Sequence, residues 1–144
     1  MIIITNMTIT DFELIKDHLI EDFDDFWTPQ TLKNELENES SKYIVAKASE
    51  QIVGFAGIWK AYDNIHITNI VVRKDCRLHG IGKLLLEKLI QISKKQNISS
   101  ITLEVNKTNR IAIQLYSEYG FKETGLRKNY YNGISDALIM TLQI

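Results

Sequence analysis

Apolar side chains recur along the chain with two different periods, which predict helices and strands. Where they recur every three or four residues, one face of a helix is apolar and can pack on a core. Capping signals support two of these helices, because Thr8 precedes Asp11 at nearly the spacing of a capping box and Thr28 precedes Pro29, the only proline. The predicted helices span residues 8–20, 28–39, 80–96 and 109–119.

Strands are predicted where apolar and polar residues alternate, or where short apolar runs lie between turns. Polar turns at Ser49–Gln51 and at Asp63-Asn64 join three of these strands into a meander of hairpins. The predicted strands span residues 1–5, 43–48, 52–59, 65–72, 100–105, 121–130 and 135–142. The element order βααβββαβαββ, with hairpins followed by a β–α–β crossover, implies an α/β (α+β) fold. Its sheet is mixed and has helices on both faces.

Composition is that of one globular domain spanning residues 1–144, with 44% apolar and 24% charged residues. A single cysteine, Cys76, excludes a disulfide framework, which suits a reducing compartment. The first residues lack the basic segment of a signal peptide, and no apolar run approaches the ~20 residues of a membrane helix. We therefore expect a cytoplasmic protein without a membrane partner.

Charge is divided unequally along the chain, although the net charge is only -1. Residues 1–72 hold 12 acidic and 5 basic side chains, a balance of -7, and residues 73–144 hold 6 and 12, a balance of +6. Such a division suggests one cationic and one anionic partner, although chance distribution over a solvated surface is an equal alternative.

The connection after the strand at 65–72 has the properties of an anion site. Gly80 and Gly82 at a helix start allow backbone N–H groups to approach a ligand, and Arg77 and Lys83 add positive charge. The spacing does not match a P-loop, and it does not match a dinucleotide-binding turn. Two glycines at a helix start are as typical of plain turns as of ligand sites.

Two spaced motifs make the pattern more specific. Arg77-x-x-Gly80-x-Gly82 resembles the [QR]-x-x-G-x-[GA] motif of the Gcn5-related N-acetyltransferase (GNAT) superfamily, and the block from Asn109 to Phe121 resembles that superfamily's second motif. The segment from Leu103 to Met140 is similar to the bacterial group that acetylates the N-terminal alanine of a ribosomal protein. The resemblance implies the GNAT fold, with a mostly antiparallel sheet, and a direct transfer of an acetyl group from acetyl-CoA to an amine.

The resemblance also implies where acetyl-CoA binds. The pyrophosphate is expected at the turn, the pantetheine arm along a strand that contains a bulge, and an asparagine side chain on the same arm. The residues expected to bind acetyl-CoA are Ile70, Val71, Val72, Arg77, Leu78, His79, Gly80, Ile81, Gly82, Lys83 and Asn109. From the sequence alone, the three strand residues are indistinguishable from ordinary strand residues, and Asn109 is equally suited to be a helix N-cap.

Glu104 and Tyr116 are the expected catalytic residues. Glu104 lies on the opposite strand face from Leu103 and Val105, in an apolar stretch, and the resemblance makes it the general base. Tyr116 lies two helical turns beyond Asn109 and is the expected acid for the leaving thiolate. The alternatives are a carboxylate that merely faces solvent and a tyrosine that merely packs in the core.

The acceptor amine is expected beside the acidic connector that follows the first helix. Four carboxylates in residues 21–25 would attract a cation, and the resemblance implies the N-terminus of a basic protein such as a ribosomal protein. A solvated acidic loop and ordinary strand aromatics are the alternative. The residues expected on this side are Asp24, Asp25, Trp27, Tyr130 and Tyr131.

Other classes of function remain open or are disfavoured. A polyamine or other small-amine acetyltransferase would suit the same acidic connector, and a non-catalytic acyl-CoA-binding module is a third possibility. A nucleophilic role for Cys76 is disfavoured because no His–Asn or His–Asp partnering is evident, and three scattered histidines give no metal-ligand spacing. We expect no metal, no direct nucleic-acid partner, and a monomer or weak dimer.

Overall fold

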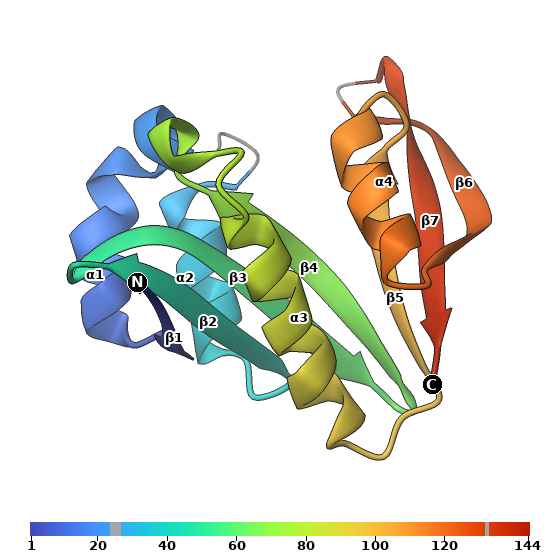
Figure 1. Cartoon of the computed structure of the whole chain (residues 1–144), viewed down its shortest axis with the longest axis horizontal. Coiled ribbons are helices and arrows are strands. Elements are labelled where there is room, and N and C mark those ends of the chain that lie inside the picture. The colour runs from blue at the N-terminus through green and yellow to red at the C-terminus, as the bar shows by residue number, and fades with distance from the viewer. Residues whose placement is uncertain (24–26, 132) are drawn as a thin grey trace.

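A single seven-stranded sheet forms the centre of the computed structural model, which describes residues 1–23, 27–131 and 133–144 (Figure 1). The sheet order is β1-β2-β3-β4-β5-β7-β6, and every neighbouring pair is antiparallel except β4 with β5. The predicted fold class and element order are confirmed. The strands are β1 (Ile2–Asn6), β2 (Ser41–Ala48), β3 (Gln51–Ala61), β4 (Asn64–Val72), β5 (Ser100–Asn106), β6 (Lys122–Tyr131) and β7 (Ser135–Gln143).

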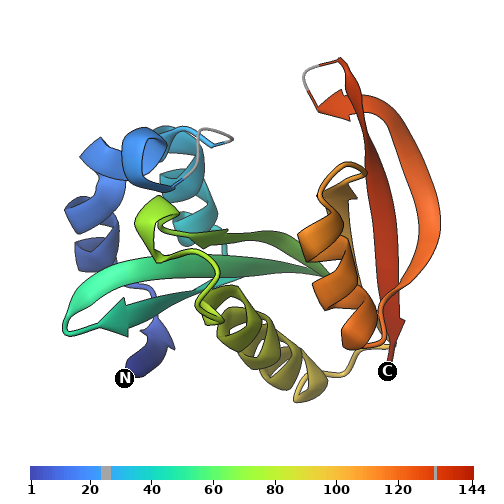
Figure 2. The same cartoon turned by 45° about the horizontal axis from the view of Figure 1, so that its top comes forward.

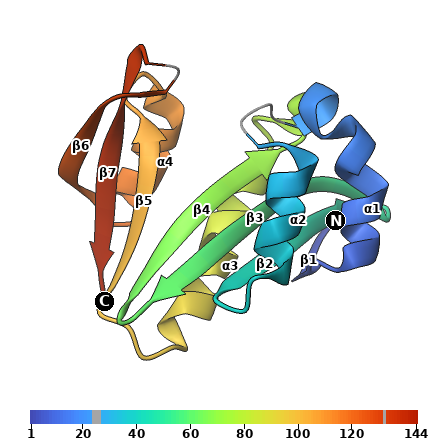
Figure 3. The ribbon, with the colours of Figure 1, turned by 180° about the vertical axis from the view of Figure 1, so that it is seen from behind.

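Helices cover both faces of this sheet. On one face, α3 (Ile81–Lys94) and α4 (Arg110–Glu118) pack over a core that includes Ile65, Leu85 and Leu103 (Figure 1). On the other face, visible in Figure 3, α1 (Ile9–Ile15) and α2 (Pro29–Glu37) pack over a smaller core. That smaller core contains Phe12, Ile15, Leu19, Phe23, Leu32, Tyr43, Val45, Ile52, Phe55 and Val71.

The first helical segment changes its winding instead of remaining α-helical to residue 20. After α1, a 3-10 turn, η1 (Lys16–His18), leads into a π-helical turn, η2 (Leu19–Phe23). Through these changes, Leu19 and Phe23 stay buried on the same side as Ile15. At its start, the segment is fixed by the predicted capping box, and Asp11 also pairs with Lys47 of β2 at 2.9 Å.

Strand β4 contains a bulge that changes which face its side chains occupy. Gly57 of β3 is opposite Asn69, whereas the next residue, Ile58, is opposite Ile67, so Thr68 is an extra residue. The resemblance predicted a bulge at Ile70–Val72, and the structure has it before that segment. The residues of β4 that pack on the larger core accordingly change from odd to even numbers, from Ile65 and Ile67 to Ile70 and Val72, while Val71 packs on the smaller core.

Strands β4 and β5 are paired for only part of their length. Their parallel register covers four residue pairs, Asn64–Ile67 with Ser100–Leu103. Beyond these pairs the two strands diverge, so that β5, β7, β6 and α4 form an arm turned away from the rest of the sheet (Figure 2). The bulge and the divergence begin at the same point of β4, and together they open the sheet at its centre.

Candidate active site

A cavity of about 370 Å³ lies where β4 and β5 diverge. Its lining comes from both sides of the gap and from both faces of the sheet, and it contains the predicted catalytic pair, Glu104 and Tyr116. Ile70, Val71 and Asn109, three of the residues expected to bind acetyl-CoA, also line it. Residues far apart in the sequence therefore meet in one pocket, as the resemblance implied.

Glu104 lines this cavity and has one carboxylate oxygen that is buried without a partner among the described residues. Its side chain is 15% exposed and alternates along β5 with the buried side chains of Leu103 and Val105, as predicted. Its Oε1 pairs with Nε of Arg127 at 3.3 Å, and Arg127 lies over the ring of Tyr130. Its Oε2 is buried and accepts no hydrogen bond from residues 1–23, 27–131 or 133–144. A buried anionic oxygen without a partner is costly, so this atom is suited to accept a proton from a ligand.

Tyr116 belongs to α4, on the opposite face of the sheet from the Glu104 side chain. Its ring packs 6.0 Å from that of Phe121, which agrees with the core role considered as the alternative. It also lines the cavity, and burial, with a smaller contribution from Tyr131, raises its pKa to about 12. A phenol that holds its proton at neutral pH can act there as an acid or a hydrogen-bond donor but not as a phenolate base.

The bulge brings a second set of polar groups to the cavity that the sequence did not reveal. Tyr43, Gly57 and Asn69 lie in one row across β2, β3 and β4. Because Gly57 has no Cβ, the ring of Tyr43 lies directly over it, and the Tyr43 hydroxyl meets Oγ1 of Thr68 at 3.0 Å. Thr68 and Asn69 both line the cavity. Polar residues interrupting an apolar strand were the available signal.

The turn before α3 exposes its backbone, as an anion site requires. Gly80 is the N-cap of α3 with φ +81°, and an added Cβ there would meet nothing within 4 Å. A Cβ on Gly82 would meet only Cγ2 of Val72, at 3.7 Å. Leu78 and Lys83 are exposed beside them, and Ile81 is buried and anchors the helix start. The first N–H groups of α3 are thus accessible to a phosphate.

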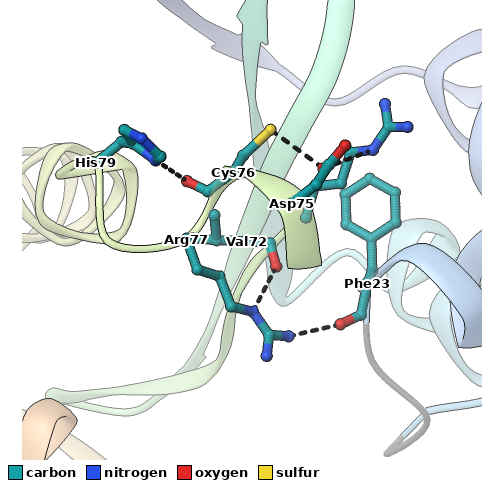
Figure 4. Close-up of polar contacts among 7 residues, drawn as sticks. Phe23, Val72, Asp75, Cys76, Arg77 and His79 are labelled. Carbon is teal, nitrogen blue, oxygen red and sulfur yellow. Dashed lines mark hydrogen bonds and ion pairs between the residues drawn. The ribbon is translucent and has the colours of Figure 1, made fainter.

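Arg77, in the turn after β4, contacts two backbone carbonyls. Figure 4 shows its guanidinium donating to the carbonyl of Val72 at 3.2 Å through Nε and to that of Phe23 at 2.8 Å through Nη2. Lys74 adds a hydrogen bond to the carbonyl of Ile20. These contacts connect the turn after β4 to η2, which contains the first residues of the acidic connector.

Two other side chains of the turn are also engaged locally. His79 donates through Nδ1 to the carbonyl of Cys76 at 3.2 Å (Figure 4). The Cys76 thiol donates to Asp75, and burial together with that hydrogen bond raises its pKa. A thiol that holds its proton is a poor nucleophile, which agrees with the expectation for Cys76.

The expected acceptor side is only partly described by the structure. Trp27 lines the cavity, and its ring lies 6.3 Å from that of Tyr43. Tyr131 lines it from the opposite side, with its ring 5.0 Å from Tyr130 in an edge-on contact. Asp24 and Asp25 lie outside the described residues. Among those described, the wall next to Glu104 is aromatic, and Asn109 caps α4 through its Oδ1 while lining the donor side.

The arrangement is suited to proton transfer on both sides of a reacting carbonyl group. An acceptor oxygen, Oε2 of Glu104, and a protonated phenol, Tyr116, come from opposite faces of the sheet into one partly enclosed pocket. In the parts of the chain that the structure describes, no group of three or more His, Cys, Asp or Glu side chains could hold a metal ion.

Comparisons with known proteins agree with this geometry. The model of the acetyltransferase (GNAT) family matches residues 12–121. A ribosomal protein bS18-alanine N-acetyltransferase of Escherichia coli K12 is 34% identical over 123 residues, which cover 82% of this chain and 81% of the relative. The bS18-alanine N-acetyltransferase of Haemophilus influenzae is 34% identical over 151 residues, 97% of both chains.

Solved structures give the same result. The crystal structure of the ribosomal-protein-S18-alanine N-acetyltransferase from Escherichia coli superposes with a TM-score of 0.90 at 31% identity, covering 100% of this chain and 94% of that one.

Among the helices that the structure describes, none combines the length and the apolar character needed to cross a bilayer.

Proposed function

Because the chain belongs to the acetyltransferase (GNAT) family, we propose that it transfers the acetyl group of acetyl-CoA to the N-terminal alanine of a small-subunit ribosomal protein. One observation is central to the proposal: a base with a free buried oxygen and a protonated phenol line one cavity at the divergence of β4 and β5. The acceptor is inferred from relatives at 34% identity that are bS18-alanine N-acetyltransferases.

The residues of this site fit acetyl-CoA. The turn at Gly80–Gly82 leaves its backbone accessible for a pyrophosphate, and Ile70 and Val71 line the gap in which the pantetheine arm would lie beside β4. Arg77, His79 and Lys83 supply positive charge or donors near the turn, although Arg77 would have to share its donors with the two carbonyls that it already contacts. An extended arm beside a strand can use backbone amides in the manner of an added strand.

In the proposed reaction, acetyl-CoA supplies the acetyl group as a thioester. Glu104 removes a proton from the acceptor ammonium through Oε2, so that the neutral amine can attack. The bulge at Thr68 frees backbone that can polarise the carbonyl oxygen. Collapse of the tetrahedral intermediate then breaks the C–S bond, and Tyr116 donates its proton to the departing sulfur. The second proton lost by the acylated nitrogen restores the proton of Tyr116. A terminal amine has a reference pKa of ~8 against ~10.4 for lysine, so a single carboxylate is sufficient as the base.

The acceptor side fits a cationic N-terminus. Trp27 and Tyr131 provide an aromatic wall, and the segment that precedes Trp27 in the sequence carries the carboxylates of Asp24 and Asp25, which would attract a cation. Acetyl-CoA and the N-terminus of a basic protein are therefore the proposed partners, in the compartment that contains ribosomes. A polyamine would respond to the same charge, and it is the alternative that the experiment must exclude.

The test is an acetylation assay with two acceptors. A basic peptide with N-terminal alanine is compared with spermidine, and mass spectrometry locates the acetyl group on the peptide. We expect kcat/KM to favour the peptide, with the acetyl group on the α-nitrogen. Preference for spermidine, or modification of lysine alone, would contradict the proposal.

A matched pair of variants tests the assignment of the base. Glu104→Gln should lower kcat strongly, whereas Glu123→Gln, the same change at an exposed position of β6, should not. Equal turnover of the two variants would contradict the assignment, whereas an absence of turnover by the wild type with either acceptor would favour the non-catalytic acyl-CoA-binding module.

A further inference from the structure

Asn69 is the second polar group of the cavity whose acceptor oxygen is buried without a partner. Its Oδ1 accepts no hydrogen bond in the described part of the chain, a property that it shares with Oε2 of Glu104. Both residues line the same cavity, Asn69 from β4 and Glu104 from β5. Buried acceptors are normally satisfied, so two unsatisfied ones on the two walls of one pocket indicate a ligand with several donors.

Another asparagine on the same strand shows how unusual this is. Asn64 lies at the end of β4 where β5 is still paired, and its Oδ1 accepts from the hydroxyls of Ser100 at 2.8 Å and Thr102 at 3.0 Å. Five residues further along, after the strands have diverged, Asn69 faces the cavity instead. The difference follows from the divergence of the strands, which removes the side chains that could have satisfied Asn69.

The position of Asn69 depends on the bulge. With Thr68 as the extra residue, Asn69 is opposite Gly57, on the same face as Tyr43 and Trp27. That face is the proposed acceptor side. Without the bulge, the alternation of the strand would turn this side chain toward α3 and its core.

We propose that Asn69 is a positioning residue whose Oδ1 accepts a hydrogen bond from the ammonium or amine nitrogen of the acceptor. This inference rests on the proposed function. A primary ammonium has three N–H donors; one proton passes to Oε2 of Glu104, and a second N–H donates to Asn69. The lone pair is left along the broken N–H bond, toward Oε2, and the hydrogen bond to Asn69 holds the neutral nitrogen in the cavity while it turns toward the thioester carbonyl.

An amide is chemically better suited to this position than a carboxylate. A neutral oxygen orients the N–H without adding to the electrostatic stabilisation of the ammonium form. A second carboxylate would bind the cation more tightly and would oppose its deprotonation by Glu104. The identity of the side chain therefore affects binding of the acceptor and proton removal in opposite ways.

The test uses two variants of Asn69 and one control on the same strand. Asn69→Leu removes the acceptor, and we expect kcat/KM for the alanine peptide to fall about 10- to 100-fold, chiefly through KM, while the Kd for acetyl-CoA is unchanged. Asn69→Asp should keep KM at or below the wild-type value but lower kcat and move the acid limb of the rate profile to higher pH. Asn64→Leu, whose oxygen is satisfied within the fold, should affect urea stability but not the KM for peptide.

The outcomes separate this inference from the proposed function. Wild-type turnover of the peptide tests the function itself. If the wild type is active and Asn69→Leu retains its KM for peptide, the inference is wrong and the function stands. If Asn69→Leu instead weakens the binding of acetyl-CoA, measured by calorimetry, Asn69 contacts the pantetheine arm and the inference is also wrong.

Discussion

The ion pair between Arg127 and Glu104 predicts a measurable shift in the pH dependence of the reaction. Arg127→Gln removes the positive charge that lies 3.3 Å from the carboxylate. Losing a nearby cation disfavours the charged form of a carboxylate, which is the form that the proposed reaction needs. The acid limb of kcat/KM is therefore expected to move upward in pH.

The size of the shift can be worked out from the geometry. Two unit charges 3.3 Å apart attract by about 5 kcal/mol at an effective dielectric constant of 20 and by about 1.3 kcal/mol in water. The Arg127 side chain is 55% exposed, so solvent screening brings the value near the lower limit, about 1 kcal/mol. At about 1.36 kcal/mol per pKa unit, the expected shift of the limb is about 0.7 pH unit.

The assay is the pH profile of kcat/KM for the alanine peptide, extended on the acid side as far as the protein stays folded, with saturating acetyl-CoA. The peptide amine titrates identically with both enzymes, so the difference between their profiles belongs to the protein. Arg127→Lys, which keeps the charge, should stay close to the wild type, and 1 M salt should reduce the difference between wild type and Arg127→Gln. An acid limb that does not move, or that moves to lower pH, would refute the electrostatic reasoning.

Four further predictions concern other parts of the molecule. Tyr116→Phe keeps the ring but removes the acid, so kcat should fall by about 10²–10⁴ with an unchanged calorimetric Kd for acetyl-CoA; an unaltered kcat would exclude the role. Gly57→Ala puts a Cβ 2.2 Å from the ring of Tyr43. The free energy of unfolding in urea should therefore fall by about 1–3 kcal/mol, and an unchanged midpoint would show that the ring moves aside. Arg77→Gln loses a positive charge near the turn and two hydrogen bonds to backbone carbonyls, so the KM for acetyl-CoA and the KM for peptide should both rise, and an unchanged KM for acetyl-CoA would exclude Arg77 as a phosphate ligand. Burial lowers the pKa of His66 from 6.5, so the unfolded chain binds a proton first and stability falls as the pH drops below 6.5. In urea titrations between pH 7.5 and 5.5, the free energy of unfolding of His66→Gln should therefore fall less than that of the wild type. An equally steep fall in both proteins would contradict this prediction.

The order of the elements was predictable because each element has a strong local signal. Capping at Thr8 and Thr28, the glycine turn and the alternating strands are all encoded within a few residues of one another. The change of winding after Ile15 was not predictable, because neither glycine nor proline marks it and the burial of Leu19 and Phe23 is compatible with several kinds of helix.

Contacts within the site depend on pairing between distant segments, and this limits what the sequence can reveal. The alternation along one strand was sufficient to predict that the Glu104 side chain lies on the opposite face from Leu103 and Val105. Its pairing with Arg127 depends on the register of three strands, and the contact of Arg77 with Phe23 spans 54 positions in the sequence. The row of Tyr43, Gly57 and Asn69 likewise exists only once β2, β3 and β4 are in register.

The short parallel pairing of β4 with β5 also determines which substitutions the protein can tolerate. In the proposed complex, the pantetheine arm lies beside the freed edge of β4 and is recognised by backbone, so exchanges among Val, Ile and Leu at 70–72 preserve recognition, whereas proline removes it. The acceptor wall is made instead of side chains such as Trp27, Asn69 and Tyr131. Substitution of a few side chains on one face can thus change which amine is bound. Recognition of acetyl-CoA by backbone groups is preserved when the side chains of β4 change.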